Sequence, residues 1–165
     1  MALRCRFVPW GMMKRTPALL ALALVVVVAP AAEANAAKKS TTISVKLQEF
    51  TLLPLPSAEA KAGTVRMKVT NKGTITHEMV LVRAPSATAL PKVTAAGGER
   101  TVGAIDEEAI PERNKMGETG DVKPRKTVSK TFKLRPGHYV MFCNIDDAAG
   151  NHFVRGMYDE FVVTK

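Results

Sequence analysis

The chain has 165 residues and a formal net charge of +9, from 24 Lys and Arg against 15 Asp and Glu. Its basic residues form no long block, and its few aromatic residues are not interleaved with them, which excludes the pattern of a nucleic-acid-binding protein. The sequence also contains no internal repeat and no glycine-rich phosphate loop, so a repeat architecture and a P-loop nucleotide site are excluded as well.

Residues 1–36 have the pattern of an export signal. Four basic residues in the first 15 positions precede an apolar run from Pro17 to Ala32, and the small-residue stretch Ala34-Asn35-Ala36 fits signal cleavage. The run is 16 residues long, shorter than the roughly 20 residues of a membrane-spanning helix, so cleavage is favoured over an uncleaved N-terminal anchor. We expect an exported protein of the periplasm or cell envelope whose mature chain lacks a membrane span.

Residues 37–165 form the predicted mature chain. They keep 20 Lys and Arg against 14 Asp and Glu, a net charge of +6. This length suits one domain and is short for two. A charge of this size, spread along the chain, indicates solubility, and we expect a monomer.

The mature chain contains a single cysteine, Cys143, because Cys5 lies in the predicted signal. Exported proteins usually carry cysteines in disulfide-bonded pairs, and a single cysteine cannot form an internal disulfide. Three roles stay open: an intermolecular bond, a buried inert thiol, or a protected functional thiol. Metal ligation requires the thiolate and would protect it.

Period-two alternation predicts that the mature chain is all-β. Apolar and polar residues alternate over Ile43–Leu47 and Val65–Val69, and less strictly over Val128–Leu134. His138–Cys143 forms an almost fully apolar strand after the turn signal Pro136-Gly137. Such patterns between turn residues indicate half-buried antiparallel strands, and a small β-sandwich is the simplest architecture.

Residues 84–125 depart from this pattern. The segment is rich in Pro and Gly and has few apolar positions in register, so we predict a long irregular excursion between strands. Residues 106–110 could form one helical turn that ends at Pro111. The excursion could be a surface connection or a partner-docking element.

The strongest functional signal is the set Cys143, His152 and Met157 near the C-terminus. A thiolate, an imidazole and a thioether are soft ligands that suit copper, particularly with a second histidine. His77, at the start of a predicted strand, is the candidate for that second ligand. His138 lies five residues before Cys143 on one strand, so its side chain points to the opposite face and we do not expect it to bind the metal.

Three stretches carry a resemblance to a known family: the turn Asn71-Lys72-Gly73 leading to His77-Glu78, the strand Leu134–Asn144, and His152–Met157. They resemble the cupredoxins, small blue-copper proteins that include plastocyanin, azurin and sulfocyanin. The resemblance covers roughly residues 41–83 and 126–163.

The resemblance implies a Greek-key β-sandwich with one mononuclear type 1 copper ion per chain, near one end. It further implies that His77, Cys143 and His152 are the strong copper ligands and Met157 the axial one. Many cupredoxins separate the cysteine from the second histidine by two to four residues, whereas eight residues, Asn144–Asn151, intervene here.

The resulting functional hypothesis is an electron carrier that exchanges single electrons with redox protein partners and breaks no substrate bond, so it is not an enzyme. A copper-binding carrier that works with a copper-trafficking protein is the alternative. Three histidines are too few for a multicopper oxidase. A thiol hydrolase is disfavoured because Cys143 ends a β pattern rather than starting a helix. A metal-free interaction module is a further alternative, but it gives no reason for the spacing of Cys143, His152 and Met157.

Overall fold

The computed structural model describes residues 41–55, 60–95 and 100–165. The predicted signal at 1–36 lies outside these residues. No helix in the described ranges combines the length and apolar character needed to span a lipid bilayer.

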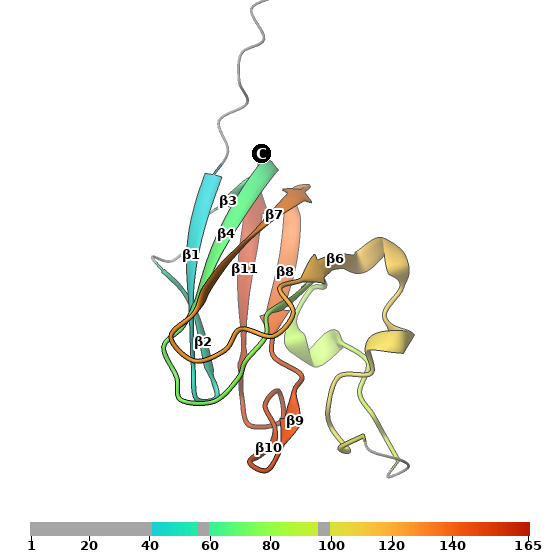
Figure 1. The fold of residues 1–165 in the computed structure, drawn as a ribbon. Helices are drawn as coiled ribbons and strands as arrows, with labels where there is room; N and C mark the ends of the chain where they lie inside the picture. Colours follow the sequence, from blue (N-terminus) through green and yellow to red (C-terminus); the bar gives the residue numbers. More distant parts are fainter. Residues whose placement is uncertain (1–40, 56–59, 96–99) are drawn as a thin grey trace, which may run out of the picture. The chain divides into compact units, whose positions relative to one another are not determined.

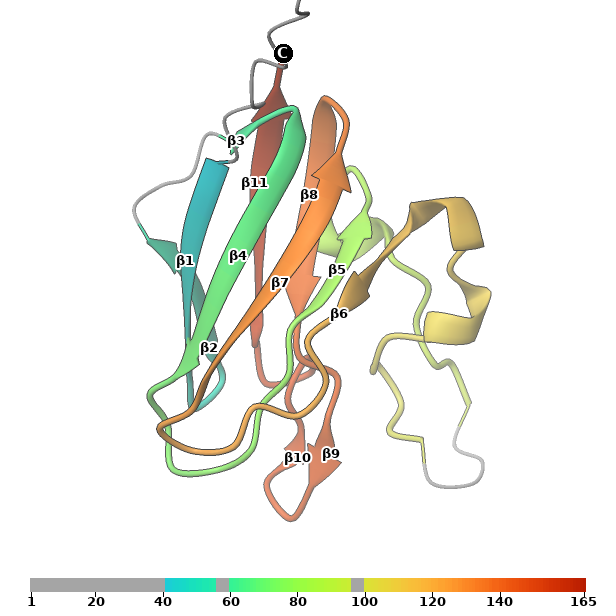
Figure 2. The ribbon, with the colours of Figure 1, turned by 45° about the horizontal axis from the view of Figure 1, so that its top comes forward.

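The first of two main sheets has four strands, drawn in Figures 1 and 2. In spatial order they are β2 (Thr51–Leu55), β1 (Thr41–Gln48), β4 (Gly63–Asn71) and β7 (Thr127–Leu134). β1 runs parallel to β4, with Val45 opposite Val69, while the other pairs are antiparallel. The expectation of purely antiparallel strands is therefore wrong here. Between β2 and β4 the chain forms β3 (Ala60–Lys61), which belongs to the other sheet. This crossover allows β4 to run in the same direction as β1.

The second sheet has five strands and lies behind the first in Figure 2. In spatial order they are β3 (Ala60–Lys61), β11 (Tyr158–Thr164), β8 (Gly137–Phe142), β5 (Val80–Arg83) and β6 (Lys115–Glu118). β3 pairs with β11 in parallel, and the remaining pairs are antiparallel. The order of strands in both sheets is non-sequential, as in a Greek-key arrangement.

The main core lies between the sheets. Every second residue of β1 is buried, including Val45 and Leu47, and these side chains share one apolar cluster with Tyr139 and Met141 of β8. His138 is exposed on the other face of β8, as its register predicts. The predicted β-sandwich is confirmed.

The excursion is more regular than expected. It contains the 3-10 turns η1 (Ala87–Ala89), η2 (Glu107–Ala109) and η3 (Glu112–Asn114), followed by strand β6. η2 falls within the helical turn predicted at 106–110.

The excursion covers the outer face of the second sheet. A second apolar cluster joins outward-facing side chains of β5 and β8 to side chains of the excursion. Its main members are Val80, Val82, Val140 and Phe142 from the strands and Leu90, Ile105 and Ile110 from the excursion. This packing explains why β8 is apolar on both faces, the pattern of a strand that is buried on both sides.

Two connecting segments meet at one end of the sandwich. One leads from β4 through His77 to β5, and the other leads from β8 to β11 through the short hairpin of β9 (Asp146–Asp147) and β10 (Gly150–Asn151). In Figure 1 this hairpin lies at the opposite end from the C-terminus. The predicted site residues come from these two segments.

Candidate metal centre

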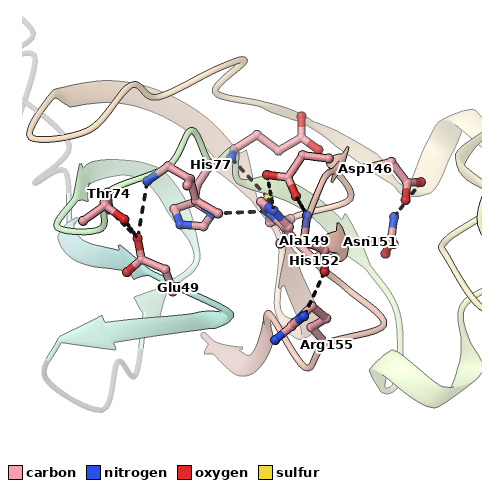
Figure 3. Close-up of polar contacts among 12 residues, drawn as sticks. Glu49, Thr74, His77, Asp146, Ala149, Asn151, His152 and Arg155 are labelled. Atoms are coloured by element: carbon pink, nitrogen blue, oxygen red, sulfur yellow. Dashed lines mark hydrogen bonds and ion pairs between the residues drawn. The ribbon is translucent and has the colours of Figure 1, made fainter.

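Three predicted ligands meet in the interior at this end of the sandwich. Nδ1 of His77 lies 3.2 Å from Nδ1 of His152, and Sγ of Cys143 lies 3.3 Å from the same atom of His152. The ligand atoms of the three residues all lie within 4.8 Å of one another, and all three side chains are 0% exposed. Figure 3 shows the two histidine rings turned toward each other.

Cys143 directly follows β8, and hydrogen bonds to its backbone N–H and to its sulfur hold it in place. Its N–H donates to the carbonyl oxygen of Met157 at 3.1 Å, and its Sγ accepts the N–H of Glu78 at 3.4 Å. Burial raises the pKa of the Cys143 thiol to about 12, while the N–H of Glu78 acts in the lowering direction. Metal binding at this site must therefore displace the thiol proton.

The loop that carries His77 is held by the side chain of Asn71. The Asn71 amide donates to the carbonyl oxygens of Ile75 at 2.8 Å and Val122 at 2.7 Å, and its oxygen accepts the N–H of Gly73 at 2.8 Å. Asn71 is 0% exposed. The sequence identified this residue as part of a turn, but the contact with Val122 joins segments 51 residues apart and has no local signal.

Glu49 supports the same loop from the β1–β2 turn. Its carboxylate accepts hydrogen bonds from the N–H and the hydroxyl group of Thr74 and from the N–H of Ile75. These contacts, led by the Thr74 N–H, lower the pKa of Glu49 to about 2. Glu49 has no signal in the sequence, because it contacts the loop only through the folded sheet.

The lowered pKa of Glu49 predicts an acid-sensitive contribution to stability. The ordinary pKa is 4.5 and the folded pKa about 2, so the contribution is present above pH 4.5 and is lost as the pH falls toward 2. Glu49→Gln should remove this part of the pH dependence. Urea unfolding at several pH values measures the effect, and an unchanged slope between wild type and variant would contradict the prediction.

The eight residues between Cys143 and His152 form an ordered hairpin that brings His152 back beside Cys143. The β9–β10 hairpin pairs Gly150 with Asp147, and the N–H of His152 donates to the carbonyl oxygen of Ile145 at 2.9 Å. Nε2 of His152 lies 3.2 Å from Oδ2 of Asp147. The pKa of Asp147 is held below its usual range, first by the N–H of Ala149 and also by the contact with His152.

Met157 lies beside two of the three converging residues, Cys143 and His152. Its N–H donates to the carbonyl oxygen of His152 at 3.0 Å, and its side chain is 0% exposed in the same apolar cluster as Cys143. The backbone thus places Met157 next to two of the predicted ligands.

The aromatic residue at the site is Phe50. Its ring meets the His152 ring edge to face, with centroids 5.3 Å apart, and the Arg155 guanidinium lies 3.9 Å from the Phe50 ring centroid. The apolar residues that adjoin Cys143 and His152 in the sequence are Phe142, Phe153 and Val154, and their positions would predict that they shield the site, but they do not. Phe142 alternates with Cys143 along the chain and faces the outer cluster together with Phe153, and Val154 is 51% exposed.

Asn144 connects the site to the excursion. Its side chain accepts the N–H of Ile105 and donates to the carbonyl oxygen of the same residue, both at 3.0 Å. Its N–H donates to the carboxylate of Glu78 at 3.0 Å. Burial is the main cause that raises the pKa of Glu78 to about 7. The residue after Cys143 thus links the excursion to the segment that carries His77.

Comparison with solved structures finds proteins of similar fold. An auracyanin from Roseiflexus castenholzii is 21% identical over 76% of this chain and 98% of its own, with a TM-score of 0.51. Auracyanin B is 21% identical over 76% of this chain and 89% of its own, with a TM-score of 0.53. A rusticyanin variant is 18% identical over 76% and 78% of the two chains, with a TM-score of 0.50.

No protein-family model matches the chain, and no curated protein matches it. At identities of 18–21%, the likeness to these solved structures concerns the fold. It agrees with the two packed sheets of this chain. The described part of the chain has the cupredoxin fold.

Proposed function

We propose that this protein is an exported type 1 copper protein that carries single electrons between redox partners. The observation that carries the proposal is the convergence of His77, Cys143 and His152, with nitrogen and sulfur atoms 3.2 and 3.3 Å apart in a buried site. Auracyanins and rusticyanin have the same fold, which supports this assignment.

The donor set fits one copper ion. Ligands that share an ion at bond lengths of about 2.0–2.3 Å lie roughly 3–4.5 Å apart, close to the spacing of these three residues. Two imidazoles and a thiolate with a weak thioether suit both Cu(I) and Cu(II), so copper here would supply reversible one-electron chemistry. His77, Cys143 and His152 would hold the ion, and Met157 would be its axial ligand.

The surrounding residues favour electron transfer over copper delivery. All three donor residues are 0% exposed, so releasing an ion to another protein would require the site to open. Asn71 and Glu49 hold the His77 loop with several hydrogen bonds, which opposes such opening. A rigid site also limits rearrangement when the charge of the ion changes.

Export, partners and assembly complete the proposal. The predicted export signal at 1–36 supports action in the periplasm or cell envelope, and we propose a monomer with a redox protein as partner. The mature chain would then begin at Ala37.

Copper titration of the purified mature chain tests the proposal. We expect one equivalent of Cu(II) to produce an intense visible thiolate-to-copper absorption that disappears and returns on reduction and oxidation. A colourless protein that binds no copper would refute the proposal. Copper binding without reversible oxidation and reduction would support the copper-carrier alternative instead.

Met157→Leu tests the axial position. We expect the variant to keep its colour, because the three strong donors remain. We also expect a raised reduction potential, because Cu(I) is stable with three donors whereas the more positive Cu(II) gains more from a fourth. Each tenfold loss of preference for Cu(II) raises the potential by about 59 mV. Voltammetry measures the shift, with Met67→Leu, a buried methionine of β4, as the control for core repacking. Equal potentials for the two variants would contradict an axial role.

A further inference from the structure

The two buried histidines, His77 and His152, differ in the hydrogen-bond partner of their Nε2 atoms. Nε2 of His152 lies 3.2 Å from the carboxylate oxygen Oδ2 of Asp147. Nε2 of His77 is buried and has no hydrogen-bond partner among the described residues. Both rings are 0% exposed, so burial alone does not account for this difference.

Asp147 is held in position by the hairpin that fills the interval between Cys143 and His152. It lies in β9 opposite Gly150, and its second oxygen, Oδ1, accepts the N–H of Ala149 at 2.7 Å. The two carboxylate oxygens therefore have separate partners, the turn and the imidazole.

We propose that Asp147 is a positioning residue that accepts the Nε2–H of His152, directs Nδ1 toward the metal site, and favours the oxidised ion. The part that concerns the ion rests on the copper site proposed above. A proton held on Nε2 leaves the lone pair on Nδ1, the atom that lies 3.3 Å from Sγ of Cys143 and 3.2 Å from Nδ1 of His77.

The carboxylate also makes the imidazole a stronger donor. A hydrogen bond from the outer nitrogen to a carboxylate raises the basicity of a metal-bound imidazole, and loss of such a partner typically weakens metal binding 10–100-fold. Because the negative charge favours the more positive ion, the loss should be greater for Cu(II) than for Cu(I). The long interval between Cys143 and His152 would then serve to bring a carboxylate to the histidine.

Asp147→Asn removes the contact with little change in shape. The asparagine side chain has one acceptor oxygen where aspartate has two, so it cannot serve both the Ala149 N–H and the His152 Nε2–H. Asp146→Asn is the matched control. It removes the same charge from the same strand, and Asp146 contacts Thr101 and Asn151 rather than a predicted ligand.

The first measurement uses the metal-free protein. Nitrogen NMR of the His152 ring, at a pH where the ring is neutral, reports which nitrogen carries the proton. We expect the proton on Nε2 in wild type and in Asp146→Asn, and a clear shift of population toward Nδ1 in Asp147→Asn. The same tautomer in all three proteins would overturn the positioning role, whether or not the protein binds copper.

The second measurement uses the copper-loaded protein. We expect the preference of Asp147→Asn for Cu(II) over Cu(I) to be at least tenfold weaker than that of wild type. Such a change raises the reduction potential by about 59 mV or more. A potential equal to that of Asp146→Asn would overturn the effect on the ion. If wild type binds no copper, the proposed function fails, and the NMR result alone decides whether Asp147 orients His152.

Discussion

Replacing Cys143 with serine is expected to abolish the visible absorption of the copper-loaded protein. The absorption requires a thiolate bound to copper, and a hydroxyl group is neither as soft a ligand nor as easily deprotonated. Cu(II) affinity should fall by more than the roughly 10–100-fold that follows loss of a residue acting only through another ligand. Absorption spectra and competition titrations against a chelator of known affinity measure both effects.

His138→Gln is the matched control for this variant. His138 lies on the same strand but is exposed on the opposite face, so its loss should leave colour and affinity unchanged. Circular dichroism of both variants checks that the sandwich is intact. A coloured Cys143→Ser protein, or a colourless His138→Gln protein, would show that the donor set differs from the one proposed.

Asn71→Ala should be the most destabilising substitution near the site. The change leaves the N–H of Gly73 and the carbonyl oxygen of Ile75 without their side-chain partners, in a region where Asn71 is 0% exposed. The carbonyl oxygen of Val122 keeps the N–H of His77 as a donor. Each unsatisfied buried group costs roughly 1–3 kcal/mol, so we expect the free energy of unfolding to fall by about 3 kcal/mol. Urea unfolding of the metal-free protein measures the loss.

Thr70→Ala provides the comparison for Asn71→Ala. Thr70 precedes Asn71 on β4, and its hydroxyl makes an exposed hydrogen bond of 2.9 Å to the Thr127 hydroxyl. Loss of an exposed bond of this kind should lower the unfolding free energy by less than about 1 kcal/mol. If the two variants lose similar stability, the Asn71 side chain does not hold the His77 loop in the way described.

The β-sandwich could be predicted from the sequence because alternating burial along a strand requires alternating apolar and polar residues, and that alternation is visible in the sequence. Val45 and Leu47 face the core, and the parity that separates His138 from Cys143 is maintained along β8. The direction of β1 relative to β4 was not accessible, because alternation is the same in parallel and antiparallel pairs. The packing of the excursion was missed because its apolar residues find their partners only in the folded sheet.

The site was predictable in part. Cys143, His152 and Met157 lie close together in sequence, and His77 followed from a family resemblance. Glu49 was missed, and Asn71 was recognised only as part of a turn, because hydrogen bonds across 25 and 51 residues have no local pattern.

Phe50 has a consequence for attempts to make this protein resist heat. It is a bulky residue with a φ of 51°, a left-handed conformation that glycine adopts readily and that typically costs other residues about 1–3 kcal/mol. Replacement with glycine would relieve the backbone but remove the ring that covers His152. Arg125 has a φ of 64° and an exposed side chain, so glycine is the safer stabilising change there. Position 50 is therefore one where thermal stability and protection of the metal site demand different residues.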